Sequence, residues 1–205
     1  ISEVLKQISP KQVLDIGTGD GEMLIELKTS SLSYCKFVGC DISKELIKIA
    51  KKLSIKYQFT ETIQFIVADM ENLPFRDGEF DSVICTAVVE HISNLKKATN
   101  ELSRVTKNGR LSIFTVPNTL YQPLFNLLAK LHLRYNDRVF YKKITLDNLI
   151  NYLKRSGLIP IFRLNFVLPI PKLFNFLEKI IQRVQLRSFH PFLNQLLVCK
   201  KISEK

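Results

Sequence analysis

Three glycines at alternate positions follow a short apolar run near the start of the chain. The run is Val13–Ile16, and Gly17, Gly19 and Gly21 follow it directly. An apolar run that ends in glycines is typical of a buried strand that turns sharply into a helix. Glycine lets the backbone adopt a positive φ and lets a ligand approach closely. We therefore expect a ligand to bind against this turn.

The residues around the glycines indicate which ligand is suitable. A nicotinamide-binding GxGxxG motif would need a glycine where this chain has Glu22. A phosphate-binding loop would need Lys and Ser or Thr at the helix start, where Asp20, Gly21 and Glu22 stand. Two carboxylates there suit the helix dipole but repel phosphate. The turn thus favours a cationic or neutral ligand, although an N-cap at Asp20 and a first-turn acid at Glu22 also explain the two side chains.

Acidic residues also follow the next two apolar runs. Asp41 ends the second expected strand, where a carboxylate can accept hydrogen bonds from both hydroxyls of a ribose. Alternatively, Asp41 caps the helix that begins near Ser43. Asp69 follows the third expected strand, where it can accept from an exocyclic adenine amine while the backbone N–H of Met70 reaches a ring nitrogen. These strand ends offer groups for an adenosine that carries no phosphate.

Strand and helix signals alternate along the first half of the chain. We expect strands at 12–16, 36–41, 62–67, 80–86 and 110–116, with helices at 21–30, 43–55 and 94–105 between them. This alternation favours a doubly wound α/β sheet with parallel strands and helices on both faces. In such a sheet, ligands bind at the carboxyl ends of the strands, near the switch in strand order.

The pattern changes in the second half of the chain. We expect a helical stretch at 120–133, a basic loop at 138–143, a helix that Thr145 caps and Gly157 stops, and strands near 158–166 and 194–200. No linker, internal repeat or low-complexity segment divides the chain. We therefore expect a single domain over 1–205.

Five ordered segments resemble class I S-adenosylmethionine (SAM)-dependent methyltransferases. They are VLDIGTGDG, VGCDIS, VADMENLPF, FDSVICTAVVEHI and VTKNGRLSIFTVPN, within residues 10–117. The similarity is greatest to the group that methylates quinones and other small molecules. The resemblance implies a seven-stranded, mostly parallel Rossmann-like sheet whose last strand is antiparallel. It also implies a cofactor-binding core at 10–117 and acceptor-side and C-terminal elements at 118–205.

The resemblance further assigns individual residues to the cofactor SAM. The residues matched to its methionine part and the surrounding loop are Asp15, Gly17, Thr18, Gly19 and Thr86. The residues matched to its ribose and adenine are Asp41, Ile42, Asp69 and Met70. Only about ten residues precede the first strand, so we expect the N-terminal helices that often cover the cofactor to be short or absent.

Glu90 and His91 follow the fourth expected strand on the side where an acceptor would bind. A sulfonium is a good leaving group, so the enzyme mainly has to align a nucleophile with the methyl carbon. A base is needed only where the acceptor must lose a proton. His91 is the candidate catalytic base because the pKa of histidine lies near neutrality. Alternatively, the pair anchors a helix start and shapes the pocket.

The excess positive charge lies in the second part of the chain. Residues 1–116 hold 15 Lys and Arg and 15 Asp and Glu, whereas residues 117–205 hold 15 and 4. In the segment 168–192, the sequence pattern predicts a basic amphipathic helix at 172–187. Three roles remain open for it: a lid packed on the core, a helix that rests on an anionic membrane and fetches a lipid-like acceptor, and an RNA-binding surface.

Several classes of protein are excluded or disfavoured. DNA amino methyltransferases carry an Asn/Asp-Pro-Pro-aromatic segment where this chain has CTAVVEH, so we expect no DNA acceptor. No 18-residue apolar run, signal peptide or metal-ligand cysteine spacing is present, which predicts a cytoplasmic protein without a metal. We expect methyl transfer to a small, apolar or lipid-linked acceptor, with peripheral contact to an anionic membrane. The alternatives are an RNA or protein methyltransferase and a non-catalytic module that keeps the cofactor fold.

Overall fold

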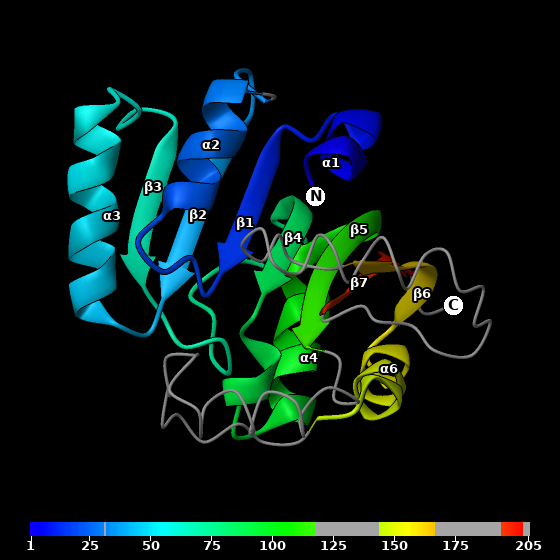
Figure 1. Cartoon of the computed structure of the whole chain (residues 1–205). Helices are drawn as coiled ribbons and strands as arrows, with labels where there is room; N and C mark the ends of the chain where they lie inside the picture. The colour runs from blue at the N-terminus through cyan, green and yellow to red at the C-terminus, as the bar shows by residue number, and fades with distance from the viewer. Residues whose placement is uncertain (31, 118–143, 167–193, 203–205) are drawn as a thin grey trace, which may run out of the picture.

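One seven-stranded sheet forms the centre of the computed structural model (Figure 1), which describes residues 1–30, 32–117, 144–166 and 194–202. Its strands are β1 (Gln12–Ile16), β2 (Lys36–Asp41), β3 (Ile63–Val67), β4 (Phe80–Thr86), β5 (Thr106–Pro117), β6 (Leu158–Phe166) and β7 (Asn194–Lys201). The helices within these ranges are α1 (Ser2–Ile8), α2 (Glu22–Ser30), α3 (Lys44–Lys56), α4 (Leu95–Val105), α6 (Leu146–Arg155) and a 3₁₀ turn, η1 (Val89–His91).

The strand order is β3-β2-β1-β4-β5-β7-β6. The first five of these strands pair in parallel, and β7 is antiparallel to both β5 and β6. The predicted fold class is therefore confirmed, including the antiparallel last strand. The chain runs outward from β1 to β3 and then returns to β4 beside β1. This reversal is the switch point at which open α/β sheets bind ligands.

Two apolar cores lie on opposite faces of the sheet. Successive residues of a strand point to opposite faces, so β1 contributes Val13 to one core and Leu14 and Ile16 to the other. The first core is closed by α1, α2 and α3, and the second by α4 and α6. The carboxyl ends of the five parallel strands consequently share one rim, at the lower side of Figure 1.

Side-chain caps fix the starts of α3 and α6. The hydroxyl of Thr145 accepts from the backbone N–H of Asn148, which confirms the predicted cap of α6. Gly157 has a φ of 82° just after that helix, as its predicted role as a stop requires. Ser43 caps α3 by accepting from the N–H of Leu46. The start of α3 at the carboxyl end of β2 is therefore fixed locally.

Strand β5 begins earlier than the predicted 110–116. Thr106 follows α4 directly and pairs with Phe80, whereas the next described pair joins Ser82 to Leu111. The intervening residues form an irregularity in which Gly109 has a φ of 75°. Because a bulge interrupts the alternation of apolar and polar residues, the sequence pattern did not include them in the strand.

The remaining features concern the N-terminal helix, the cysteines and the segments of the second half of the chain. A short helix, α1, precedes β1 and buries Leu5. All four cysteines are buried and free of disulfides, and burial raises the thiol pKa of Cys35, Cys40 and Cys199 to about 12. The predicted helix at 120–133, the loop at 138–143 and the segment 168–192 lie outside the described residues. Within the described ranges, every helix is too short or too polar to cross a membrane.

Candidate functional site

The turn between β1 and α2 contains three glycines with positive φ: 69° at Gly17, 59° at Gly19 and 81° at Gly21. A Cβ at Gly17 would lie 2.0 Å from Cγ2 of Val88, and one at Gly21 would lie 2.6 Å from Cζ of Phe65. A Cβ at Gly19 would meet no atom within 4 Å. The first and third glycines therefore permit close packing, and the turn is open at Gly19.

Backbone hydrogen bonds hold this turn against β2. The N–H groups of Gly17 and Thr18 donate to the carbonyl oxygen of Cys40, at 2.8 and 3.0 Å. The N–H of Gly19 donates to Oδ2 of Asp41 at 3.0 Å. The other oxygen of Asp41 accepts from the N–H of Ser43 at 2.9 Å. Asp41 thus joins the glycine turn to the start of α3, so the alternative of a helix-start role is true in part.

Asp15 is fully buried in β1, between β2 and β4. Neither of its carboxyl oxygens has a hydrogen-bond partner among the described residues, and neither has the buried hydroxyl of Thr18. Burial raises the pKa of Asp15 to about 7. The Thr18 hydroxyl, which lies near the carboxyl but does not meet hydrogen-bond geometry, opposes the rise, and the negative charge of Asp41 adds to it. Buried polar groups without partners are costly, so these oxygens mark a place for a hydrogen-bond donor.

The loop after β3 brings the third predicted acid to the same rim. The N–H of Ala68 donates to the carbonyl of Asp41 at 3.0 Å, which continues the pairing of β3 with β2. Oδ1 of Asp69 accepts from the N–H of Glu71 at 2.8 Å. The side chain of Met70 is buried in the core on the α4 side. Ile42 is 73% exposed beside Asp41.

A network of side chains holds this loop on α4, and sequence reasoning missed it. Glu71 accepts from the N–H of Asn94 at 2.7 Å, and Glu101 accepts from the N–H of Leu73 at 2.8 Å. Arg104 donates to the carbonyl of Leu73 at 3.0 Å and to both oxygens of Glu101. Because these partners lie far apart in the chain, no local sequence pattern predicts their hydrogen bonds.

The chain leaves β4 at Thr86 through a strained residue. Ala87 has a φ of 54°, which is unusual for a residue with a side chain, and its N–H donates to Oγ1 of Thr115 at 3.1 Å. In η1, which follows, His91 is exposed and Glu90 is 6% exposed. Oε2 of Glu90 has no hydrogen-bond partner in the described part of the chain, and burial raises the pKa of this carboxyl.

The two buried carboxyl groups lie around one thiol. Burial raises the pKa of Cys85 well above its usual value, and the charges of Asp15 and Glu90 both add to the rise. Cys85 is paired with Ile16 across β4 and β1, at the switch point. The structure therefore brings together the predicted Asp15, the glycine turn, Asp41 and Asp69 on one rim. Glu90 adds a buried carboxyl there, where the sequence suggested that it anchors a helix start and shapes the pocket.

This rim can bind a ligand with amino and hydroxyl donors. It offers unpaired carboxyl oxygens, an open backbone turn and an exposed apolar side chain. Among the described residues, no three His, Cys, Asp or Glu side chains gather closely enough to hold a metal ion.

A family model described as a methyltransferase domain matches residues 14–114. The ubiquinone/menaquinone biosynthesis C-methyltransferase UbiE of Geotalea uraniireducens is 31% identical over 119 residues, which are 56% of this chain and 51% of that protein. The tRNA (carboxymethyluridine(34)-5-O)-methyltransferase of Arabidopsis thaliana is 43% identical over 107 residues, 51% of this chain and 23% of that protein. The chain thus spans about half the length, or less, of these relatives.

A solved geranyl diphosphate methyltransferase in complex with SAM has a similar fold. Its TM-score is 0.67 at 12% identity, and the match covers 98% of this chain and 84% of that chain. At this identity the likeness concerns the fold alone.

Proposed function

Because this chain belongs to the class I SAM-dependent methyltransferase family, we propose that it transfers the methyl group of SAM to an acceptor. The observation that carries the proposal is a group of buried oxygens without partners beside an open glycine turn. They belong to Asp15 and Thr18, and Gly19 is the open position. A ligand with a positively charged amino group would pair with them.

The residues present fit this cofactor. Asp15 would accept from its amino group, and Asp41 would accept from its ribose hydroxyls. Each oxygen of Asp41 accepts one backbone N–H, and a carboxylate oxygen can accept a second hydrogen bond. Asp69 and the N–H of Met70 would contact the adenine edge, with the exposed Ile42 against its face.

Bound SAM supplies a methyl group on a sulfonium, which is already a good leaving group. The main task of the chain is therefore to bind and orient the two substrates and to exclude water, because the methyl donor needs little further activation. The backbone of Gly17, Thr18, Gly19 and Thr86 would line the methionine part. Where the acceptor carries a proton, His91 is the proposed base, because it follows β4 on the rim and its side chain is exposed.

We propose a small, apolar or lipid-linked acceptor, delivered with peripheral contact to an anionic membrane. Support comes from the relatives that act on quinones and from the basic amphipathic pattern at 172–187. An RNA acceptor is the second candidate, because residues 117–205 carry the whole net charge of +11 and one relative is a tRNA methyltransferase.

A transfer assay with methyl-labelled SAM tests the proposal. The protein is incubated with separate lipid, small-molecule and RNA fractions, and label is measured in each fraction. We expect label in the lipid or small-molecule fraction, and the Asp41→Ala variant should lose most of it. Label in RNA alone would select the second candidate. SAM binding without label in any fraction, protein included, would indicate a non-catalytic module.

Calorimetry separates the cofactor from the acceptor. SAM and its demethylated product should bind in the micromolar range, about −8 kcal/mol. NAD and ATP should bind far more weakly, because acidic residues at the start of α2 disfavour phosphate. NAD binding as tight as that of SAM would contradict the assignment of the glycine turn.

A further inference from the structure

Strand β3 forms one edge of the sheet. It pairs with β2 on one side, and no described strand pairs with its other side, where the N–H of Ile63 donates to the carbonyl of Phe59 at the start of the strand. The strand reads Ile-Gln-Phe-Ile-Val, without a charged residue, a proline or a bulge. Natural proteins usually protect an open edge with one of these features or cover it. An unprotected edge of this kind is suited to pairing with another strand.

The direction of the backbone groups follows from the pairing with β2. The carbonyl of Thr62 and the N–H of Ala68 both bond to β2. Backbone groups of successive strand residues point to alternate sides, so Gln64 and Ile66 also face β2. The N–H and C=O groups of Phe65 and Val67 therefore point to the open side. An added strand would find two donors and two acceptors there.

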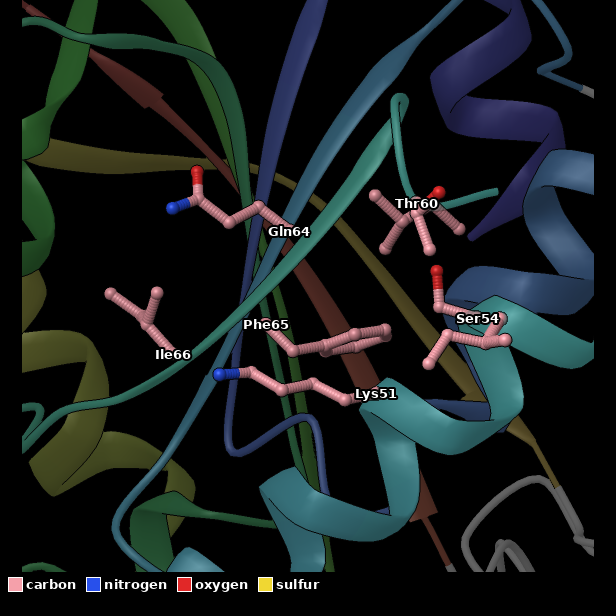
Figure 2. A pocket seen from close by; sticks show the side chains of 8 residues that line it. Lys51, Ser54, Thr60, Gln64, Phe65 and Ile66 are labelled. Atoms are coloured by element: carbon pink, nitrogen blue, oxygen red, sulfur yellow. The ribbon is translucent and has the colours of Figure 1, made fainter. Parts of the chain in front are cut away.

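A cavity of about 360 Å³ runs along this edge (Figure 2). Its lining comes from Lys51, Ser54 and Ile55 of α3, from Thr60, and from residues 63–66 of β3. Figure 2 shows Phe65 on the side of α3 and Gln64 and Ile66 on the opposite side of the strand. Because both faces of β3 contribute, the cavity lies against the strand edge and not on one face of the sheet.

A hydroxyl that has no partner in the described part of the chain lines the cavity, and apolar side chains are exposed beside it. Ser54 is 3% exposed, and its Oγ has no hydrogen-bond partner among the described residues. Ile55 is 65% exposed at the rim, and Val67 is 45% exposed at the end of the strand. A segment that fills the cavity would bury the side chain of Ile55, and a strand added along the same edge would cover Val67.

The charge of α3 indicates the chemistry of the occupant. The helix carries five lysines and one glutamate, and all six side chains are exposed. A second copy paired edge to edge would bring two such helices beside each other, and their like charges would repel. An acidic segment would be attracted instead.

We propose that the open edge of β3 binds an extended, acidic segment of a partner protein. The segment adds a strand beside β3, its apolar side chains enter the cavity, and its carboxylates lie near the lysines of α3. This surface is separate from the cofactor rim, so the proposal does not rest on the proposed reaction.

A synthetic peptide of about nine residues is the probe. Its odd positions alternate valine and glutamate, so both lie on one face of the strand, and its even positions are threonine. A matched peptide carries lysine for glutamate. We expect the acidic peptide to bind, by fluorescence anisotropy at low salt, at least tenfold more tightly than the basic one. Equal binding of the two peptides would overturn the proposal.

Backbone methylation distinguishes strand pairing from charge attraction alone. One acidic peptide is N-methylated at odd positions and another at even positions, so that each loses the N–H groups of one edge. Only one edge faces β3, so one peptide should lose binding at least tenfold and the other should retain it. Hydrogen exchange at the amides of Phe65 and Val67 should slow with the unmethylated peptide. Equal affinity of the two methylated peptides would overturn the proposal.

Protein variants locate the site. Lys51→Glu with Lys52→Glu should weaken the acidic peptide at least tenfold, and Ile55→Ser should weaken it about threefold. The control pair is Lys96→Glu with Lys97→Glu on α4, which makes the same charge change on another helix and should alter affinity less than twofold. Circular dichroism checks that each variant is folded. An equal loss of peptide affinity in the control pair would overturn the proposal. A dimer in sedimentation that Ile55→Ser dissociates would also overturn it, because a second copy of the chain would then be the occupant.

Discussion

Protonation of Asp15 should compete with the binding of a cationic ligand at this carboxyl. Burial raises its pKa to about 7 from the usual 3.8. In the unfolded chain the group ionises near its usual value, and in the folded chain only near neutrality. The folded state therefore holds more protons between these values, and its stability falls as the pH rises through them. A cationic ligand favours the ionised form, so its binding should release a proton near neutral pH.

We expect the unfolding free energy of the ligand-free protein to fall from about pH 4 to about pH 7 and then to level. The raised pKa corresponds to about 4 kcal/mol at most. Asp15→Asn cannot ionise, so it should lose this component of the pH dependence and be more stable than the parent at about pH 8. Urea unfolding at a series of pH values measures the difference. The same slope in both proteins would show that Asp15 is not the titrating group.

Asp41 should contribute directly to cofactor affinity. Asp41→Ala removes charge-assisted hydrogen bonds to the ribose and should cost about 1.5–3 kcal/mol of binding free energy. It also removes the acceptors of the Gly19 and Ser43 N–H groups, so thermal unfolding should be followed alongside calorimetry. Glu61→Ala, an exposed carboxylate in the loop before β3, is the control and should leave affinity unchanged. Full affinity in Asp41→Ala would remove it from the site.

His91→Ala tests the proposed base. We expect turnover to fall about 100-fold while SAM affinity stays nearly unchanged, because general base catalysis acts on the chemical step. Glu90→Gln is the companion variant, since Glu90 is the buried neighbour with an unpartnered oxygen. Near-full turnover in His91→Ala would leave alignment of the substrates as the main effect. A loss of stability in Glu90→Gln alone would assign that carboxyl to the fold.

At the scale of the elements, the glycine turn has one glycine that packs against the core and one that is open to a ligand. Gly17→Ala should cost about 2 kcal/mol or more of stability, because it adds a left-handed alanine and a contact 2.0 Å from Val88. Gly19→Ala should cost only about 1 kcal/mol, because its Cβ meets open space. For SAM affinity we expect the opposite order: Gly19→Ala should weaken binding more than Gly17→Ala, because Gly19 is the open position. Urea unfolding and calorimetry measure the two quantities.

Val88→Ala provides the matched rescue for this pair. It should recover part of the stability lost in Gly17→Ala and none of that lost in Gly19→Ala, because only Gly17 packs against Val88. Equal stability losses in Gly17→Ala and Gly19→Ala, with no rescue of either by Val88→Ala, would contradict the assignment of Gly17 to packing and of Gly19 to binding.

The elements themselves were largely predictable from sequence. The bounds of β1, β2 and β4 match the prediction because short apolar runs end at glycine or at acidic and polar residues there. The start of β5 was not predictable, because the bulge around Gly109 interrupts the alternation. The role of Arg104 was also hidden, since its partners Leu73 and Phe75 lie 31 and 29 residues earlier. Such contacts exist only after β3 and α4 have packed.

At the scale of the whole molecule, the charge is distributed unevenly along the chain. Residues 1–116 are neutral in sum, and residues 117–205 carry +11. The described part of the second region includes Lys154, Arg155 and Arg163 on α6 and β6, next to the antiparallel edge of the sheet. The acidic residues at the carboxyl ends of the parallel strands and the basic second region therefore belong to different parts of the sequence. That separation is consistent with an anionic surface or acceptor near the C-terminal elements.

Sedimentation with vesicles tests the membrane role of the segment 172–187, which lies outside the described residues. The segment has four basic residues and one acid, and each basic residue near an anionic surface contributes about 1 kcal/mol, or about 3 kcal/mol net. We expect the protein to sediment with anionic vesicles at low salt, to come off at high salt because screening shortens the attraction, and to stay largely in solution with neutral vesicles.

Changing Lys179, Arg183 and Arg187 to Glu should abolish that sedimentation and leave SAM affinity intact. The control changes Lys48, Lys51 and Lys52 of α3 to Glu, which alters the net charge of the molecule by the same amount. Sedimentation lost in both variants would mean that net charge and not the segment drives the attraction. Protein left in solution with both kinds of vesicle at low salt would contradict the membrane role. The apolar positions Leu173, Leu177 and Ile180 would then be assigned to packing on the core, as in a lid over the acceptor.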